Sequence, residues 1–151
     1  MIPTTVARVP EHTAESANEA IRRRTHEDIA RIAAGGPEAI DRRLAELDQE
    51  WDIERTLEAN AATVALVGLG LRTFMDRRYY LLPAAVAGFL LQHAVQGWCP
   101  PLPVFRRLGV RTASEIDEER YALKALRGDF RDVTTGDGPT RIDRALRAVR
   151  S

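Results

Sequence analysis

Residues 79–105, YYLLPAAVAGFLLQHAVQGWCPPLPVF, contain no Asp, Glu, Lys or Arg, although 29% of the 151-residue chain is charged. Shortly before them, residues 59–71 read ANAATVALVGLGL and are also uncharged. Between the two stretches lie only Arg72, three further residues and a short polar connection, Asp76-Arg77-Arg78. Two apolar stretches joined by a tight polar turn are typical of a helical hairpin that spans a membrane.

The lengths of the two stretches fit such a hairpin. The first span, from Thr56 to Met75, is long enough to cross about 30 Å of hydrocarbon at about 1.5 Å per residue. The second runs from Tyr79 to Trp98, with aromatic side chains at both ends as at a membrane interface. Ala84 and Gly88 form a small step of the kind that lets membrane helices approach closely. The alternative is a helix hairpin buried in a soluble bundle.

The flanking segments are charged and predict further helices, so the fold class is all-α. Gly35-Gly36 followed by Pro37 predicts a helix end and a new helix start. After it, Ile40, Leu44, Leu47 and Trp51 recur at helical spacing and predict one buried face. The predicted parts are a flexible arm (1–13), an N-terminal charged helical pair (14–55), a transmembrane hairpin with the GWCPP turn (56–112) and C-terminal soluble helices (113–151).

The composition excludes several classes of function. The formal net charge is zero, so no global field favours nucleic acid. Cys99 is the only cysteine, which rules out an intrachain disulfide and a multi-cysteine metal site. Residues 1–16 lack the apolar region of a cleavable signal peptide, so none is predicted. No Ser/His/Asp arrangement, phosphate loop or metal-ligand cluster stands out, and no cofactor or metal is expected.

The polar side chains of the second span are candidate site residues. Gln92 and Gln96 are one helical turn apart, so both can bond across to Asn60 or Thr63 of the first span. Between them lies His93, for which a proton or ligand site is the alternative interpretation. Joint metal binding by His93 and Cys99 is disfavoured, because two ligands are too few for a protein-made site.

Cys99 lies in the sequence Gly97-Trp98-Cys99-Pro100-Pro101, where the prolines end the second span. Nearby arginines would lower the pKa of its thiol if the turn brings them close, and so favour the reactive thiolate. Without that geometry, Cys99 is a small interfacial residue held by a turn. The arginines concerned are Arg106, Arg107 and Arg111.

The segment HAVQGWCPPLPVFRRLGVRT, residues 93–112, resembles the signature of the YgaP-like inner-membrane domain family. Gly97, Trp98, Cys99 and Pro100 match its Gly-aromatic-Cys-Pro step, and the closing step is matched by Leu108, Gly109, Val110 and Thr112. The resemblance covers roughly residues 52–112 and implies a two-helix bacterial membrane hairpin without an assigned biochemical role. The insertion of Pro101-Leu102-Pro103 departs from the pattern, and no sulfurtransferase loop accompanies it.

These observations together predict an integral inner-membrane protein that serves as a scaffolding or oligomerisation hairpin, without catalysis of its own. An excess of flanking arginines over the two in the connecting loop places both termini in the cytoplasm. The expected partners are the lipid bilayer, a second copy bound through the hairpin, and a protein partner bound through the charged helices. The alternatives are a thiol- or sulfur-handling membrane protein that uses Cys99, and a soluble all-α interaction module.

Overall fold

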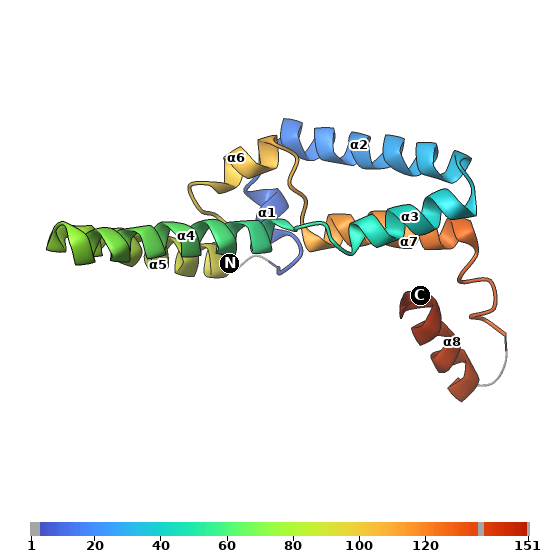
Figure 1. Ribbon diagram of the computed structural model, residues 1–151. Coiled ribbons are helices and arrows are strands. Elements are labelled where there is room, and N and C mark those ends of the chain that lie inside the picture. Colours follow the sequence, from blue (N-terminus) through green and yellow to red (C-terminus); the bar gives the residue numbers. More distant parts are fainter. Residues whose placement is uncertain (1–3, 136–137, 151) are drawn as a thin grey trace. The chain divides into compact units, whose positions relative to one another are not determined.

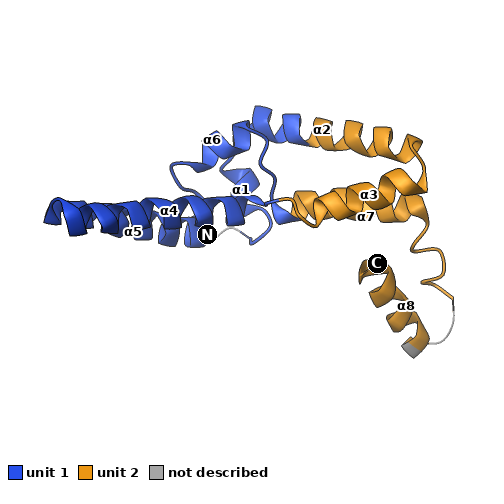
Figure 2. Cartoon of the chain, in the orientation of Figure 1, with its two compact units in different colours: residues 1–21, 51–113 blue, residues 22–50, 114–151 orange. Residues whose placement is uncertain are grey.

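The structure, a computed structural model, describes residues 4–135 and 138–150 (Figure 1). All regular secondary structure in these residues is helical, which confirms the predicted all-α class. The chain divides into two compact units (Figure 2). Unit 1 comprises residues 1–21 and 51–113, and unit 2 comprises residues 22–50 and 114–151.

Unit 1 is built on a helical hairpin. Its helices are α1 (Arg8–Glu11), the start of α2 (Glu15–Ala34), α4 (Ile53–Phe74), the 3-10 helix η1 (Arg77–Tyr80), α5 (Leu81–Gln96) and α6 (Leu102–Arg107). The helices α4 and α5 lie side by side along their length (Figure 1). Asp52 begins α4 by accepting a 2.8 Å hydrogen bond from the N–H of Arg55. Asp76 begins η1 in the same way, because it accepts a 2.8 Å hydrogen bond from the N–H of Arg78. The chain reverses direction at this point, between α4 and α5.

The core of unit 1 lies at the base of this hairpin, where the start of α4 meets the start of α6. Ile53 and Leu102 are completely buried there. A fully buried aliphatic side chain contributes about 1.5–3 kcal/mol, so this cluster anchors the hairpin. Its other members are Val9, Leu57 and Cys99, with Phe105 and Val110 packed against them.

Unit 2 contains the rest of α2 with α3 (Pro37–Leu47), α7 (Ala113–Arg127) and α8 (Gly138–Arg150). Its helix α3 begins at Pro37 after Gly36 adopts a φ of 80°, as the Gly-Gly-Pro break predicts. The predicted apolar stripe is confirmed at Ile40, Leu44 and Leu47, whereas Trp51 is 49% exposed. The core of unit 2 consists of Ile32, Ile40, Leu44, Leu47, Ile116 and Leu123.

A buried ion pair ties α3 to α7 in unit 2. The carboxylate of Glu119, on a residue with no exposed surface, accepts hydrogen bonds from Arg43 Nε at 2.8 Å and Nη2 at 3.1 Å. This bidentate contact raises the pKa of Arg43 above its ordinary value, so the guanidinium stays charged. Lys124 of α7 also donates to the carbonyl oxygen of Val149 in α8 at 2.7 Å.

Two segments contain helices that the sequence does not predict. The segment predicted as a flexible arm contains α1, and its Val9 is 3% exposed. The proline-rich segment after Trp98 contains α6, with Pro101 at its N-cap and Pro103 in its first turn. Proline is compatible with these positions because the first N–H groups of a helix have no intrahelical acceptor.

The predicted membrane spans are not found. No helix in the described part of the chain combines the length and the apolar character that a bilayer crossing requires. The helix α5 has 16 residues, which extend about 24 Å at about 1.5 Å per residue. The 22 residues of α4 are long enough but include Glu54, Arg55, Glu58 and Arg72. The prediction of an integral inner-membrane protein, with transmembrane spans and an inner-membrane location, is therefore wrong.

Candidate functional site

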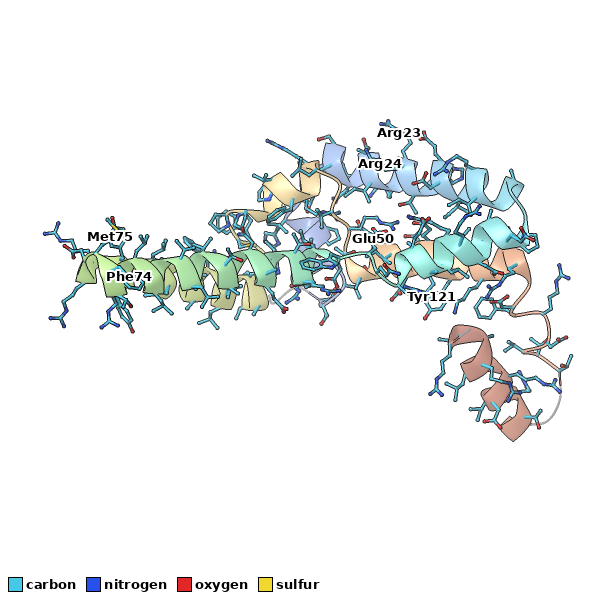
Figure 3. All side chains as sticks on the ribbon, in the orientation of Figure 1. Arg23, Arg24, Glu50, Phe74, Met75 and Tyr121 are labelled. Atoms are coloured by element: carbon cyan, nitrogen blue, oxygen red, sulfur yellow. The ribbon has the colours of Figure 1, made fainter. Side chains whose placement is uncertain are left out.

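The α4/α5 hairpin exposes many large apolar side chains. Phe74 is 87% exposed and Met75 is 68% exposed, and both lie at the turn of the hairpin (Figure 3). Large apolar surfaces of this kind mark interaction sites in folded proteins. The other exposed members on α4, η1 and α5 are Leu66, Val67, Leu69, Tyr79, Tyr80, Leu81, Leu82, Phe89, Leu90, Leu91 and Val95.

The helix α4 is apolar on two opposite faces. Its inner face meets α5, and Gly68 lies at a close approach, because a Cβ there would lie 2.8 Å from Pro83 Cδ. Its outer face carries Leu66, which is 69% exposed, and Leu69, which is 41% exposed. Contact with α5 therefore leaves this outer apolar face of α4 exposed.

The outer face of α5 is similarly open. Leu81 and Leu91 are 71% and 67% exposed, and they are separated by Ala84 and Gly88. A Cβ added to Gly88 would meet nothing within 4 Å. The two small residues that the sequence singled out thus lie on a free face of the hairpin, and not at the contact between its helices.

The polar residues of α5 separate into one buried and two outer positions. His93 is 4% exposed, and its Nε2 lies 2.8 Å from a carboxylate oxygen of Glu54 on α4. The other oxygen of Glu54 accepts a 2.8 Å hydrogen bond from Arg8 of α1. Gln92 is partly exposed and Gln96 is exposed.

The predicted hydrogen bonds from these glutamines to Asn60 or Thr63 are absent from the described residues. The Thr63 hydroxyl donates instead to the carbonyl oxygen of Ala59, one turn earlier in α4, at 2.7 Å. The contact that joins the two helices at the base is therefore His93–Glu54, which the sequence did not single out.

The GWCPP turn holds α1 against the base of the hairpin. Gly97 ends α5 in the left-handed conformation, with a φ of 81°. A Cβ on Gly97 would lie 2.5 Å from the carbonyl oxygen of Arg8, so only glycine allows this approach of the α1 backbone. Trp98 and Pro101 are partly exposed and Pro100 is exposed. The turn is therefore a structural junction.

Cys99 lies inside the core of unit 1 and is 5% exposed. Burial raises the pKa of its thiol, the N–H of Leu102 lowers it by a smaller amount, and the charge of Glu54 raises it further. The neighbouring Arg106 turns away, toward Thr13 and Asn18. The pKa shift is thus opposite to the one expected for a reactive thiolate.

We expect Cys99 to react slowly with iodoacetamide at neutral pH, because it is buried and its pKa is raised. The rate should fall well below that of a model thiol and approach it when the chain is unfolded in urea. Mass spectrometry of the alkylated chain measures both rates. Alkylation of the folded chain at the rate of the model thiol would contradict this placement.

The structure also shows a buried arginine that the sequence does not distinguish from its neighbour. Arg106 is 1% exposed and donates to Thr13 Oγ1 at 3.3 Å, to Asn18 Oδ1 at 2.9 Å and to the carbonyl oxygen of Val110 at 3.0 Å. Arg107, the next residue, is exposed. No local signal separates two adjacent arginines, because their burial depends on partners far away in the chain.

Comparison with protein-family models, with curated proteins and with solved structures finds no match to this chain. The resemblance of residues 93–112 to the YgaP-like family therefore stays a prediction. The arrangement on the hairpin is suited to binding through shape and apolar contact, because its outer faces carry Leu, Val, Ala and Gly.

Proposed function

We propose that this chain is a helical interaction module that self-associates through its α4/α5 hairpin. One observation carries the proposal. Both helices are apolar on the face opposite to their mutual contact, with Leu66, Leu81 and Leu91 each more than 65% exposed. Exposed apolar faces of this size normally mark a surface that a partner covers, so a further surface is expected to cover these faces.

The chemistry of the hairpin favours a second copy as the covering surface. The outer positions of α5 carry no charge, because residues 79–105 contain no Asp, Glu, Lys or Arg. A matching surface must also be apolar and elongated, and the outer stripes of the hairpin helices have both properties. Most homo-oligomers are closed symmetric dimers in which the same patch of both subunits forms the interface.

The proposal predicts a dimer that a single charge on the hairpin disrupts. We expect the unaltered chain to sediment as a dimer at micromolar concentration in detergent-free buffer. At least one of Leu66→Glu, on the outer face of α4, and Leu91→Glu, on the outer face of α5, then places an unpaired carboxylate in the apolar contact, which costs several kcal/mol and weakens association by about a hundredfold or more. Analytical ultracentrifugation measures the dissociation constant, and circular dichroism confirms that each variant keeps its helices.

The matched control is Leu126→Glu, because Leu126 is 56% exposed on α7, outside the hairpin. We expect this variant to sediment like the unaltered chain. The proposal fails if the unaltered chain stays monomeric across the concentration range. It also fails if the hairpin variants remain as dimeric as the Leu126 control.

A further inference from the structure

The outer face of α4 has the spacing of a coiled-coil seam. Its members are separated by three, four, three and four residues, which is the repeat that lets two helices interlock along one stripe. The seam consists of Ala59, Ala62, Leu66, Leu69 and Thr73. Leu66 is its most exposed large side chain at 69%, and Leu69 follows at 41%.

Two opposite charges lie along the same edge of this seam. Glu58 and Arg72 are 72 − 58 = 14 residues apart, which equals two seven-residue repeats, so both occupy the same side of α4. Both side chains are exposed. Glu58 makes no ion pair within the described residues, and the Arg72 guanidinium rests 5.2 Å from the centre of the Tyr80 ring.

We propose that a second copy of the chain binds this seam with its α4 running in the opposite direction. This inference rests on the proposed function and names the surface and the orientation of the dimer. Leu66 then packs against Ala62 of the partner subunit, and Leu69 packs against Ala59 of the partner subunit. Glu58 pairs with Arg72 of the partner subunit, and the twofold symmetry repeats each contact.

Size and charge both select the antiparallel orientation. The Leu66–Ala62 and Leu69–Ala59 layers of the antiparallel seam each place one large side chain opposite one small side chain, which fills the space evenly. A parallel seam would instead place Leu66 against its own copy and leave Ala62 facing alanine. It would also put the two copies of Glu58 on opposite edges of the seam, and likewise the two copies of Arg72, so neither charge would pair with the other.

Charge reversal tests the orientation. Glu58→Arg alone creates two Arg–Arg contacts across the seam, and Arg72→Glu alone creates two Glu–Glu contacts. We expect each single variant to raise the dimer dissociation constant about tenfold, since exposed ion pairs are worth about 0.2–1 kcal/mol each. The double variant Glu58→Arg with Arg72→Glu restores the pairs and the affinity, and an equimolar mixture of the two single variants forms a heterodimer.

Arg24→Glu and Glu38→Arg make the same charge reversals at exposed positions outside the hairpin and should leave the dissociation constant unchanged. Analytical ultracentrifugation gives each constant, and native mass spectrometry identifies the heterodimer.

The outcomes separate the orientation from the proposed function. If Leu66→Glu disrupts the dimer but the double variant does not restore the affinity, the antiparallel pairing is overturned and the proposed function stays intact. A dimer disrupted by Leu91→Glu alone places the interface on α5. A monomeric unaltered chain rejects the proposed function itself.

Discussion

Replacing Gly97 by alanine is expected to release α1 from the base of the hairpin and to lower the free energy of unfolding of unit 1 by about 3 kcal/mol. The left-handed φ of 81° costs an alanine about 1–2 kcal/mol. The added Cβ would also lie 2.5 Å from the carbonyl oxygen of Arg8 and 2.7 Å from its carbonyl carbon. These are backbone atoms, so α1 must move, and Val9 then leaves the core.

Urea unfolding followed by tryptophan fluorescence measures the effect, because Trp51 and Trp98 both belong to unit 1. The protein concentration must be held constant, since self-association adds to apparent stability. The matched control is Gly88→Ala, whose Cβ meets nothing within 4 Å. Alanine in place of a helical glycine stabilises by roughly 0.5–1 kcal/mol, so the control should shift in the opposite direction. Equal midpoints for the two variants would contradict the close approach of α1 to Gly97.

Replacing Arg106 by methionine is expected to lower the free energy of unfolding of unit 1 by about 3 kcal/mol or more. Methionine keeps most of the side-chain volume but removes hydrogen bonds from a charged donor, each of which contributes about 1.5–3 kcal/mol. Asn18 is 6% exposed and Thr13 is 9% exposed, so water cannot easily replace the guanidinium that they contact. The same fluorescence measurement reports the loss.

Arg107→Met is the matched control for Arg106→Met, because it makes the same substitution at the neighbouring exposed position. We expect it to change the free energy of unfolding by less than about 0.5 kcal/mol. Similar losses in the two variants would indicate that net charge, and not the buried hydrogen bonds of Arg106, accounts for the effect. A neutral result for Arg106→Met would show that this buried contact does not stabilise unit 1.

The membrane prediction failed for a reason that local composition does not reveal. Residues 79–98 are apolar enough to suggest a span, but two capping features shorten the helix that they form. Asp76 and η1 delay the start of α5 to Leu81, and the left-handed Gly97 ends it after Gln96. Hydropathy describes how apolar a segment is, whereas helix length depends on where the backbone hydrogen bonds begin and end.

The candidate site was predicted unevenly. The sequence identified the hairpin and its small residues, because composition and spacing are local properties. It misplaced the α5 side of the contact within the hairpin, because Pro83 meets Gly68 of α4 while Gly88 remains open. For Cys99 it left two interpretations open, a pKa lowered by nearby arginines or a residue merely held by the turn, and burial in fact raises that pKa. Which face of α4 meets α5, and which arginine is buried, depend on residues distant in the chain.

The sequence by itself determined the helical class, the break at Gly35-Gly36-Pro37 and the apolar stripe of α3. These features follow from backbone preferences and helical spacing, which act within a few residues. Only the tertiary structure decided that His93 pairs with Glu54, that α1 closes on Gly97 and that one face of each hairpin helix stays open. Burial depends on which residues lie nearby in three dimensions. A leucine of α4 therefore belongs to the core or to an exposed face according to what packs beside it.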